Sequence, residues 1–85
     1  MSDYTITISR TAKKQLDILP EKTFIIVIDT IKLLAFDPRP IGCKKLKGRE
    51  GYRIRKGDYR IIYDIYETLL IIEVVAMGHR KDVYR

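Results

Sequence analysis

The sequence predicts an α+β fold with the element order βααβββ, in which two N-terminal helices pack on one face of a twisted, mostly antiparallel sheet. Three observations lead to this prediction. Residues of alternating character flank a short glycine-containing turn near residue 57, two segments of helical periodicity precede it, and an apolar run follows it. Because 85 residues support one compact core, we interpret residues 1–85 as a single domain.

The chain is expected to start with a strand and a helix. Residues 4–8 alternate between β-favouring apolar residues and threonine, which is typical of a strand with one buried face. Ser9 is a residue type that caps helices, and Ala12 and Leu16 follow at the helical spacing of four. Pro20 is expected to end this helix or to begin the next one.

The segment 21–36 has two interpretations, because the β-branched run within residues 24–28 is also typical of a buried strand. Its length favours a helix, which then joins the first helix in an αα-hairpin. Ile25 and Ile26 lie partly off the expected core face, so they form either a partner-binding strip or part of a broadly buried helix. The expected core face consists of Phe24, Val27, Ile28, Ile31, Leu34 and Ala35.

Two prolines and a glycine in residues 37–42 form the clearest break in the chain. An extended or irregular basic segment is expected over residues 43–49, followed by a β-hairpin that turns at residues 56–58. The third strand is expected at about 59–66, and the fourth, after a turn at Glu67-Thr68, at 69–77. Apolar residues fill both faces of the fourth strand, which indicates a central position in the sheet.

The positive charge is concentrated in one part of the chain. Between Lys44 and Arg60, eight basic side chains stand against Glu50 and Asp58, and this excess equals the whole net charge of +6. A local basic segment favours nucleic acid or an acidic protein as a partner, and a solvated basic loop is the alternative.

Three arginines of this segment are expected to lie close together. Arg53 and Arg55 are two residues apart in a strand, so their side chains share one face, opposite Tyr52 and Ile54. Arg60 lies across the turn, where strand pairing brings it near the other two. Guanidinium groups held together repel one another, so this arrangement predicts a polyanionic ligand.

Other classes of function are disfavoured. Cys43 is the only cysteine and His79 the only histidine, so neither an internal disulfide nor a metal or cofactor site is predicted. The most apolar run, residues 24–36, contains Asp29 and Lys32 and is too short to span a membrane. The start of the chain lacks an export signal, and we expect a cytoplasmic protein.

Four motifs occur in order at characteristic spacing: Leu46-Lys47-Gly48, Gly51-Tyr52-Arg53-Ile54-Arg55, Gly57-Asp58-Tyr59-Arg60-Ile61-Ile62-Tyr63 and Gly78-His79-Arg80-Lys81-Asp82-Val83-Tyr84. With Ser9, Ala12 and Leu16 at the start of the first helix, the spacing covers nearly the whole chain. Together they resemble the RelE branch of the RelE/ParE toxin superfamily. The resemblance implies the toxin of a type II toxin-antitoxin pair, which cuts messenger RNA in the ribosomal A site without a metal ion. It also implies a cognate, RelB-like antitoxin that masks the basic segment.

The resemblance also implies the residues of the reaction. In this family the RNA's own 2′-hydroxyl attacks the adjacent phosphate, which requires a base, positive charge on the phosphorane and an acid. Guanidinium groups suit the charge role because they fork onto two phosphate oxygens. A tyrosine can stack on a base or orient the hydroxyl. Carried over by position, the catalytic residues are Arg53, Arg55, Arg60, Arg80 and Tyr84.

The identity of the general base is left open. Members of this branch often carry lysines on the first hairpin strand, where this chain has Arg53 and Arg55. Arginine is a poor base, because its reference pKa is about 12.5 or more. Histidine titrates near neutrality, so His79 is a candidate acid or base, and a surface or capping role is the alternative.

Four lysines are interpreted as RNA-binding residues that add nonspecific affinity for phosphate: Lys44, Lys45, Lys47 and Lys56. The fold alone does not separate the nuclease from a ParE-like inhibitor of DNA gyrase, or from an inactive module that only binds an antitoxin. Retention of the arginines and of Tyr84 favours the nuclease.

Overall fold

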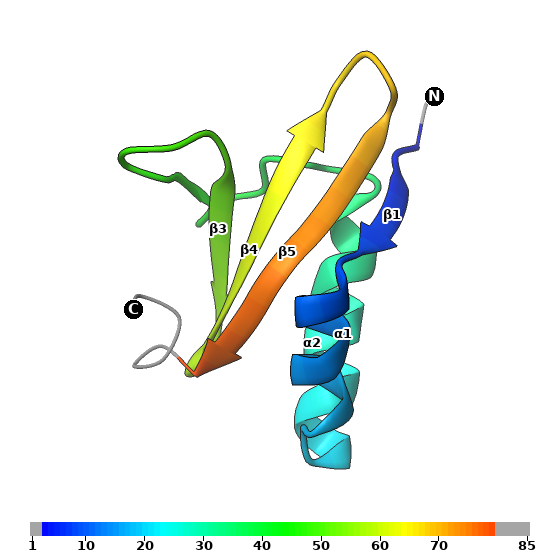
Figure 1. The fold of residues 1–85 in the computed structure, drawn as a ribbon, viewed down its shortest axis with the longest axis vertical. Helices are drawn as coiled ribbons and strands as arrows, with labels where there is room; N and C mark the ends of the chain where they lie inside the picture. The colour runs from blue at the N-terminus through cyan, green and yellow to red at the C-terminus, as the bar shows by residue number, and fades with distance from the viewer. Residues whose placement is uncertain (1–2, 80–85) are drawn as a thin grey trace.

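The computed structural model describes residues 3–79 and confirms the α+β prediction. Within these residues, two helices lie on one side of a five-stranded sheet (Figure 1). The strands run in the order β1-β5-β4-β3-β2, and only the β1–β5 pairing is parallel. The elements are β1 (Thr5–Ile8), α1 (Arg10–Asp17), α2 (Glu21–Leu34), β2 (Lys44–Lys45), β3 (Tyr52–Lys56), β4 (Tyr59–Tyr66) and β5 (Ile71–His79).

Two details differ from the sequence-based expectation. The basic segment before the hairpin contains a short strand, because the main chain of β2 pairs with that of β3. The last strand, expected at 69–77, spans Ile71–His79. It begins later because the turn after β4 runs through Leu70, and it continues past residue 77 because Gly78 and His79 still pair with β4. Leu70 has a φ of 56°, and its N–H donates to the carbonyl of Glu67, so its backbone is not extended. β4 has the bounds that the alternation predicts.

An irregularity in β5 is joined to α1 by side-chain hydrogen bonds. Tyr63 pairs with Val74 while Ile62 pairs with Ala76, so Val75 is an extra residue in the strand. The Ser9 hydroxyl donates to the Val75 carbonyl at 2.6 Å and accepts from the N–H of Ala12 at 3.0 Å. One serine therefore caps α1 and satisfies a carbonyl of the bulge. On the same side, the N–H of Met77 donates to the side-chain oxygen of Gln15 at 2.7 Å.

The core lies between the helices and the sheet. Its members come from both helices and from the three strands β3, β4 and β5: Ala12, Leu16, Val27, Ile31, Leu34, Ile54, Ile61, Tyr63, Ile72, Val74 and Met77. The bulge keeps both Val74 and Met77 on the core face, although three positions separate them. Tyr59 and Tyr63 pack in or against this core, as expected for sheet tyrosines.

The expectation that Phe24 belongs to the core is wrong, because its side chain is 38% exposed. It lies in the first turn of α2, and this end of the helix pair extends past the end of the sheet (Figure 1). No helix within residues 3–79 is long and apolar enough to cross a membrane.

Candidate nucleic-acid interface

Four basic side chains of the described residues share the face of the sheet opposite α1 and α2. Arg55 pairs directly with Arg60 across the hairpin, and Lys44 of β2 pairs with Arg53. Directly paired residues have Cβ atoms about 4.5–5.5 Å apart. The four positions therefore form a contiguous basic surface across β2, β3 and β4. We call Lys44, Arg53, Arg55 and Arg60 the arginine face.

The pleat of β3 separates this surface from the core. Tyr52 and Ile54 point toward the helices, and Ile54 is buried, whereas Arg55 is exposed. Arg53 and Arg60 are half-buried. The arrangement is the one that the alternation in the sequence predicts.

The hairpin turn and the neighbouring strand place small residues beside the arginines. Gly57 begins the two-residue turn with a φ of 59°, a conformation that glycine adopts without strain. On the other side of β4, Arg60 pairs with Gly78 and Ile62 pairs with Ala76. Small residues in a strand allow another backbone to approach closely.

The same face becomes acidic toward the far end of β4. Arg49 donates to both carboxylate oxygens of Asp64, at 3.1 and 3.3 Å, and the hydroxyl of Tyr66 donates to Glu73 at 3.4 Å. The nearby carboxylate of Asp64, more than any other group, raises the pKa of the Tyr66 hydroxyl. The carboxylates of Asp64 and Glu73 therefore lie at one end of this face, and the arginine face lies at the other.

Gly51 allows the Arg49–Asp64 ion pair to form where it does. A Cβ atom at residue 51 would lie 2.7 Å from Oδ1 of Asp64, and the φ of Gly51 is 125°. Its carbonyl also accepts from the N–H of Leu46 at the base of the β2–β3 loop. A hollow of about 310 Å³ lies at this point, lined by Arg49, Glu50, Gly51, Tyr52, Asp64, Ile65 and Tyr66.

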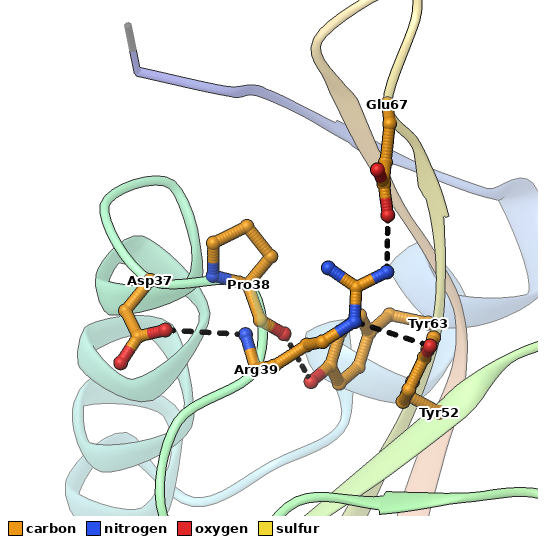
Figure 2. Close-up of polar contacts among 6 residues, drawn as sticks. All are labelled: Asp37, Pro38, Arg39, Tyr52, Tyr63 and Glu67. Carbon is orange, nitrogen blue, oxygen red and sulfur yellow. Dashed lines mark hydrogen bonds and ion pairs between the residues drawn. The ribbon is translucent and has the colours of Figure 1, made fainter. Parts of the chain in front are cut away.

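Arg39 ties the loop before β2 to the sheet, and Figure 2 shows its contacts. Its Nε donates to the Tyr52 hydroxyl at 3.1 Å, its guanidinium lies 5.1 Å from the centre of the Tyr52 ring, and it forms an ion pair with Glu67. The hydrogen bond to Tyr52 raises the pKa of the Arg39 guanidinium above its ordinary value, and the hydrogen bond to Glu67 adds to this effect.

A second tyrosine anchors the same loop. The Tyr63 hydroxyl donates to the carbonyl of Pro38 at 2.7 Å (Figure 2). Burial of this side chain raises the pKa of the Tyr63 hydroxyl well above its ordinary value, and the neighbouring Cys43 adds to the effect. The sequence analysis did not identify Arg39. The sequence feature that could have pointed to Arg39 is its position between two prolines, where the backbone is restricted.

The other predicted site residues are not gathered on the arginine face. Lys45 pairs with Tyr52 and Lys56 pairs with Tyr59, so both positions belong to the helix side of the sheet. Lys47 lies in the β2–β3 loop and is exposed. Of the four lysines expected to bind RNA, only Lys44 shares a face with the arginines.

His79 also lies on the helix side. It pairs with Tyr59, and the two rings meet edge to face at a centroid distance of 5.9 Å and an angle of 74°. Arg80 and Tyr84 fall outside the described residues. Among residues 3–79, no three His, Cys, Asp or Glu side chains are gathered in a way that could hold a metal ion.

Comparisons with known proteins identify the family. A family model for the ParE toxin of type II toxin-antitoxin systems, parDE, matches residues 6–84. Toxin RelE of Mycobacterium tuberculosis (strain ATCC 25618 / H37Rv) is 31% identical over 90 residues, which cover 100% of this chain and 93% of that protein. The chain belongs to the RelE branch of the RelE/ParE toxin superfamily. It is therefore a toxin of the type II toxin-antitoxin class.

Solved structures have the same fold as this toxin. The RelBE2 toxin-antitoxin complex from Mycobacterium tuberculosis contains a chain that matches with a TM-score of 0.83 and 28% identity, over 96% of this chain and 97% of that one. The archaeal RelE-RelB complex from Pyrococcus horikoshii OT3 matches with a TM-score of 0.83 and 26% identity, over 95% and 99%. Both are complexes of a toxin with its antitoxin.

Proposed function

We propose that the toxin is a ribosome-dependent endoribonuclease that cuts messenger RNA in the A site. The observation that carries the proposal is the arginine face, in a chain of the RelE branch: Arg53, Arg55 and Arg60 share the side of the sheet opposite the helices. Because the ribosome is the site of action, the proposal implies a cytoplasmic protein.

The reaction that suits this surface needs no cofactor. The 2′-hydroxyl oxygen attacks the adjacent phosphorus, the bond from phosphorus to the 5′-oxygen breaks, and the products carry a 2′,3′-cyclic phosphate and a 5′-hydroxyl. A base takes the proton of the 2′-hydroxyl, and an acid donates one to the leaving oxygen. The phosphorane carries extra negative charge, which neighbouring guanidinium groups stabilise.

We assign this charge stabilisation to Arg60, helped by Arg55 directly across the hairpin. Arg53 and Lys44 extend the basic surface by one strand and hold the adjoining phosphates. Arg80 and Tyr84 are included in the proposal by family resemblance, with Arg80 on the phosphorane and Tyr84 on a base.

The proton transfers need a group other than the three arginines, whose pKa is too high for a base. His79 is the chemical candidate, although its ring lies beside Tyr59 on the helix side of β5. A role for His79 therefore requires its side chain to reach past the end of the strand. His79→Gln tests it, because an acid or base role changes the pH profile of cleavage and a packing role does not.

The proposed partner is a cognate, RelB-like antitoxin whose acidic or amphipathic segment covers residues 44–60. Two relatives of similar fold are known as toxin-antitoxin complexes, and the local excess of positive charge in this toxin favours an acidic cover. Co-expression with the neighbouring gene product should give a complex that weakens at high salt. Failure of the two to co-purify would argue against this partner.

The experiment is primer extension on a defined messenger bound to ribosomes, with the wild type, Arg60→Ala and Lys56→Ala. We expect cleavage at the A-site codon by the wild type and by Lys56→Ala, and little by Arg60→Ala. Free messenger should remain intact, and cut ends should carry the cyclic phosphate. Absence of cleavage together with inhibition of gyrase supercoiling would replace the nuclease with a ParE-like inhibitor. Absence of both effects would indicate an inactive antitoxin-binding module.

A further inference from the structure

Helix α2 has a second apolar stripe that points away from the sheet. Its core stripe consists of Val27, Ile31 and Leu34. On the opposite side, Ile25 is 51% exposed and Phe36, in the turn that follows the helix, is 68% exposed. A helix that is apolar on two sides usually has partners on two sides.

The outward stripe has a charged centre with apolar ends. Positions 25, 29 and 32 lie along one side of α2, and position 36, in the turn after the helix, continues the same spacing. We call Ile25, Asp29, Lys32 and Phe36 the outer stripe. Within residues 3–79, neither Asp29 nor Lys32 forms an ion pair.

This order of residues is complementary to itself. When two copies of α2 are laid antiparallel with the two-fold axis between residues 30 and 31, Asp29 of each copy faces Lys32 of the other. Ile25 of each copy then faces Phe36 of the other. A two-fold interface requires such reciprocal matching, because each residue meets its counterpart twice.

We propose that the outer stripe of α2 is the interface of a two-fold homodimer of this toxin, with the two α2 helices antiparallel. A second copy supplies the apolar cover and both ion pairs. The expected acidic antitoxin is matched to a different surface, because the outer stripe carries one acidic and one basic residue. The helices and the arginine face lie on opposite sides of the sheet, so dimerisation leaves both arginine faces exposed.

The length of α2 limits the area of the contact between the two copies. A helix of 14 residues is about 21 Å long, so one helix pair gives a contact near the small end of specific interfaces. We therefore expect a weak, reversible dimer and not a permanent one.

The test is sedimentation velocity of the full chain, refolded after purification in denaturant, from about 1 to 200 µM. The wild type should shift from monomer to dimer across this range. Asp29→Lys and Lys32→Asp each bring like charges together, so each should weaken the dimer by about tenfold or more. The double exchange D29K/K32D restores the opposite charges and should restore the dimer.

Two further variants control for surface hydrophobicity. Phe36→Ser should weaken the dimer, whereas Leu69→Ser, an equally exposed position in the β4–β5 turn, should not. A chain that stays monomeric at 200 µM, or a dimer unaffected by the single exchanges, would overturn the proposal. A monomeric toxin whose antitoxin binding is lost on Asp29→Lys would assign the stripe to the antitoxin and overturn it as well.

Discussion

The two faces of the hairpin differ in what their residues do, although both faces belong to the same strands. On β3, Ile54 is buried against the helices while Arg55, the next residue, is exposed on the other face. On β4, Ile61 has no exposed surface and the adjacent Arg60 pairs with Arg55. Because the strand is pleated, neighbouring residues point to opposite faces: one contributes to the core and the next to the proposed chemistry. Adjacent substitutions should therefore have unrelated effects.

The largest expected effect on stability is that of Ile54→Ala. Truncating a buried isoleucine removes apolar contacts and leaves a cavity, so unfolding free energy should fall by about 2–5 kcal/mol. Arg55→Ala, one residue away, should change it by no more than about 0.5 kcal/mol. Urea denaturation followed by circular dichroism measures both. Equal losses for the two variants would contradict the separation of the faces.

A smaller loss of stability is expected for Ser9→Ala, at the junction of α1 and the β5 bulge. The substitution removes the helix cap and the hydrogen bond to the Val75 carbonyl, so it should cost about 1–2 kcal/mol. Ser9→Thr keeps the hydroxyl and should retain most of the stability. Thermal unfolding of the three proteins compares them, and an unchanged melting temperature for Ser9→Ala would refute this role.

The stability of the fold is expected to depend on pH through the hydroxyl of Tyr63. Burial raises the pKa of its hydroxyl above the unfolded value of about 10, so the folded state holds this proton more tightly. Its contribution to stability is full below pH 10 and is lost as the pH rises further. Tyr63→Phe should cost about 1 kcal/mol at neutral pH, through the lost bond to Pro38.

Stability curves from pH 8 to 11.5 measure the difference between wild type and Tyr63→Phe. The difference in unfolding free energy between the two proteins should become smaller above pH 10, because the variant has no hydroxyl to ionise at this position. A gap that stays constant would show that Tyr63 does not titrate as its burial requires.

The smallest expected effect compares two neighbouring lysines on opposite faces. Lys44 shares the arginine face, whereas Lys45 pairs with Tyr52 on the helix side. For single-stranded RNA, loss of one phosphate contact lowers the slope of log affinity against log salt by about 0.7. We expect this change for Lys44→Ala and none for Lys45→Ala in fluorescence anisotropy titrations. Equal slopes for the two variants would remove Lys44 from the interface.

Much of this fold could be predicted from local patterns. The alternation from Tyr52 to Tyr66 around Gly57 was sufficient for the hairpin, and the length of the segment after Pro20 was sufficient for α2. The bulge at Val75 could not be predicted, because the surrounding strand is apolar on both faces and alternation is lost there. β2 was missed since two residues carry no periodic signal.

The placement of the candidate site residues could be predicted only where the pleat determines the face. Arg53, Arg55 and Arg60 followed from their positions in the hairpin, whereas the lysines were grouped by charge alone. Their separation onto different faces depends on the register with β2 and β4, which the sequence does not specify for so short a strand. The contacts of Arg39 join three distant segments, and such long-range pairing leaves no local pattern.

The most direct measurement of the central claim is the single-turnover rate of messenger cleavage on ribosomes for four variants that each remove one positive charge. Arg55→Ala and Arg60→Ala change positions on the arginine face. Lys45→Ala and Lys56→Ala are the controls, because their positions are on the helix side. We predict at least about a hundredfold loss for Arg60→Ala, a smaller loss for Arg55→Ala, and rates within about threefold of wild type for both lysine variants. Equal losses from the two faces, or full activity of both arginine variants, would contradict the account.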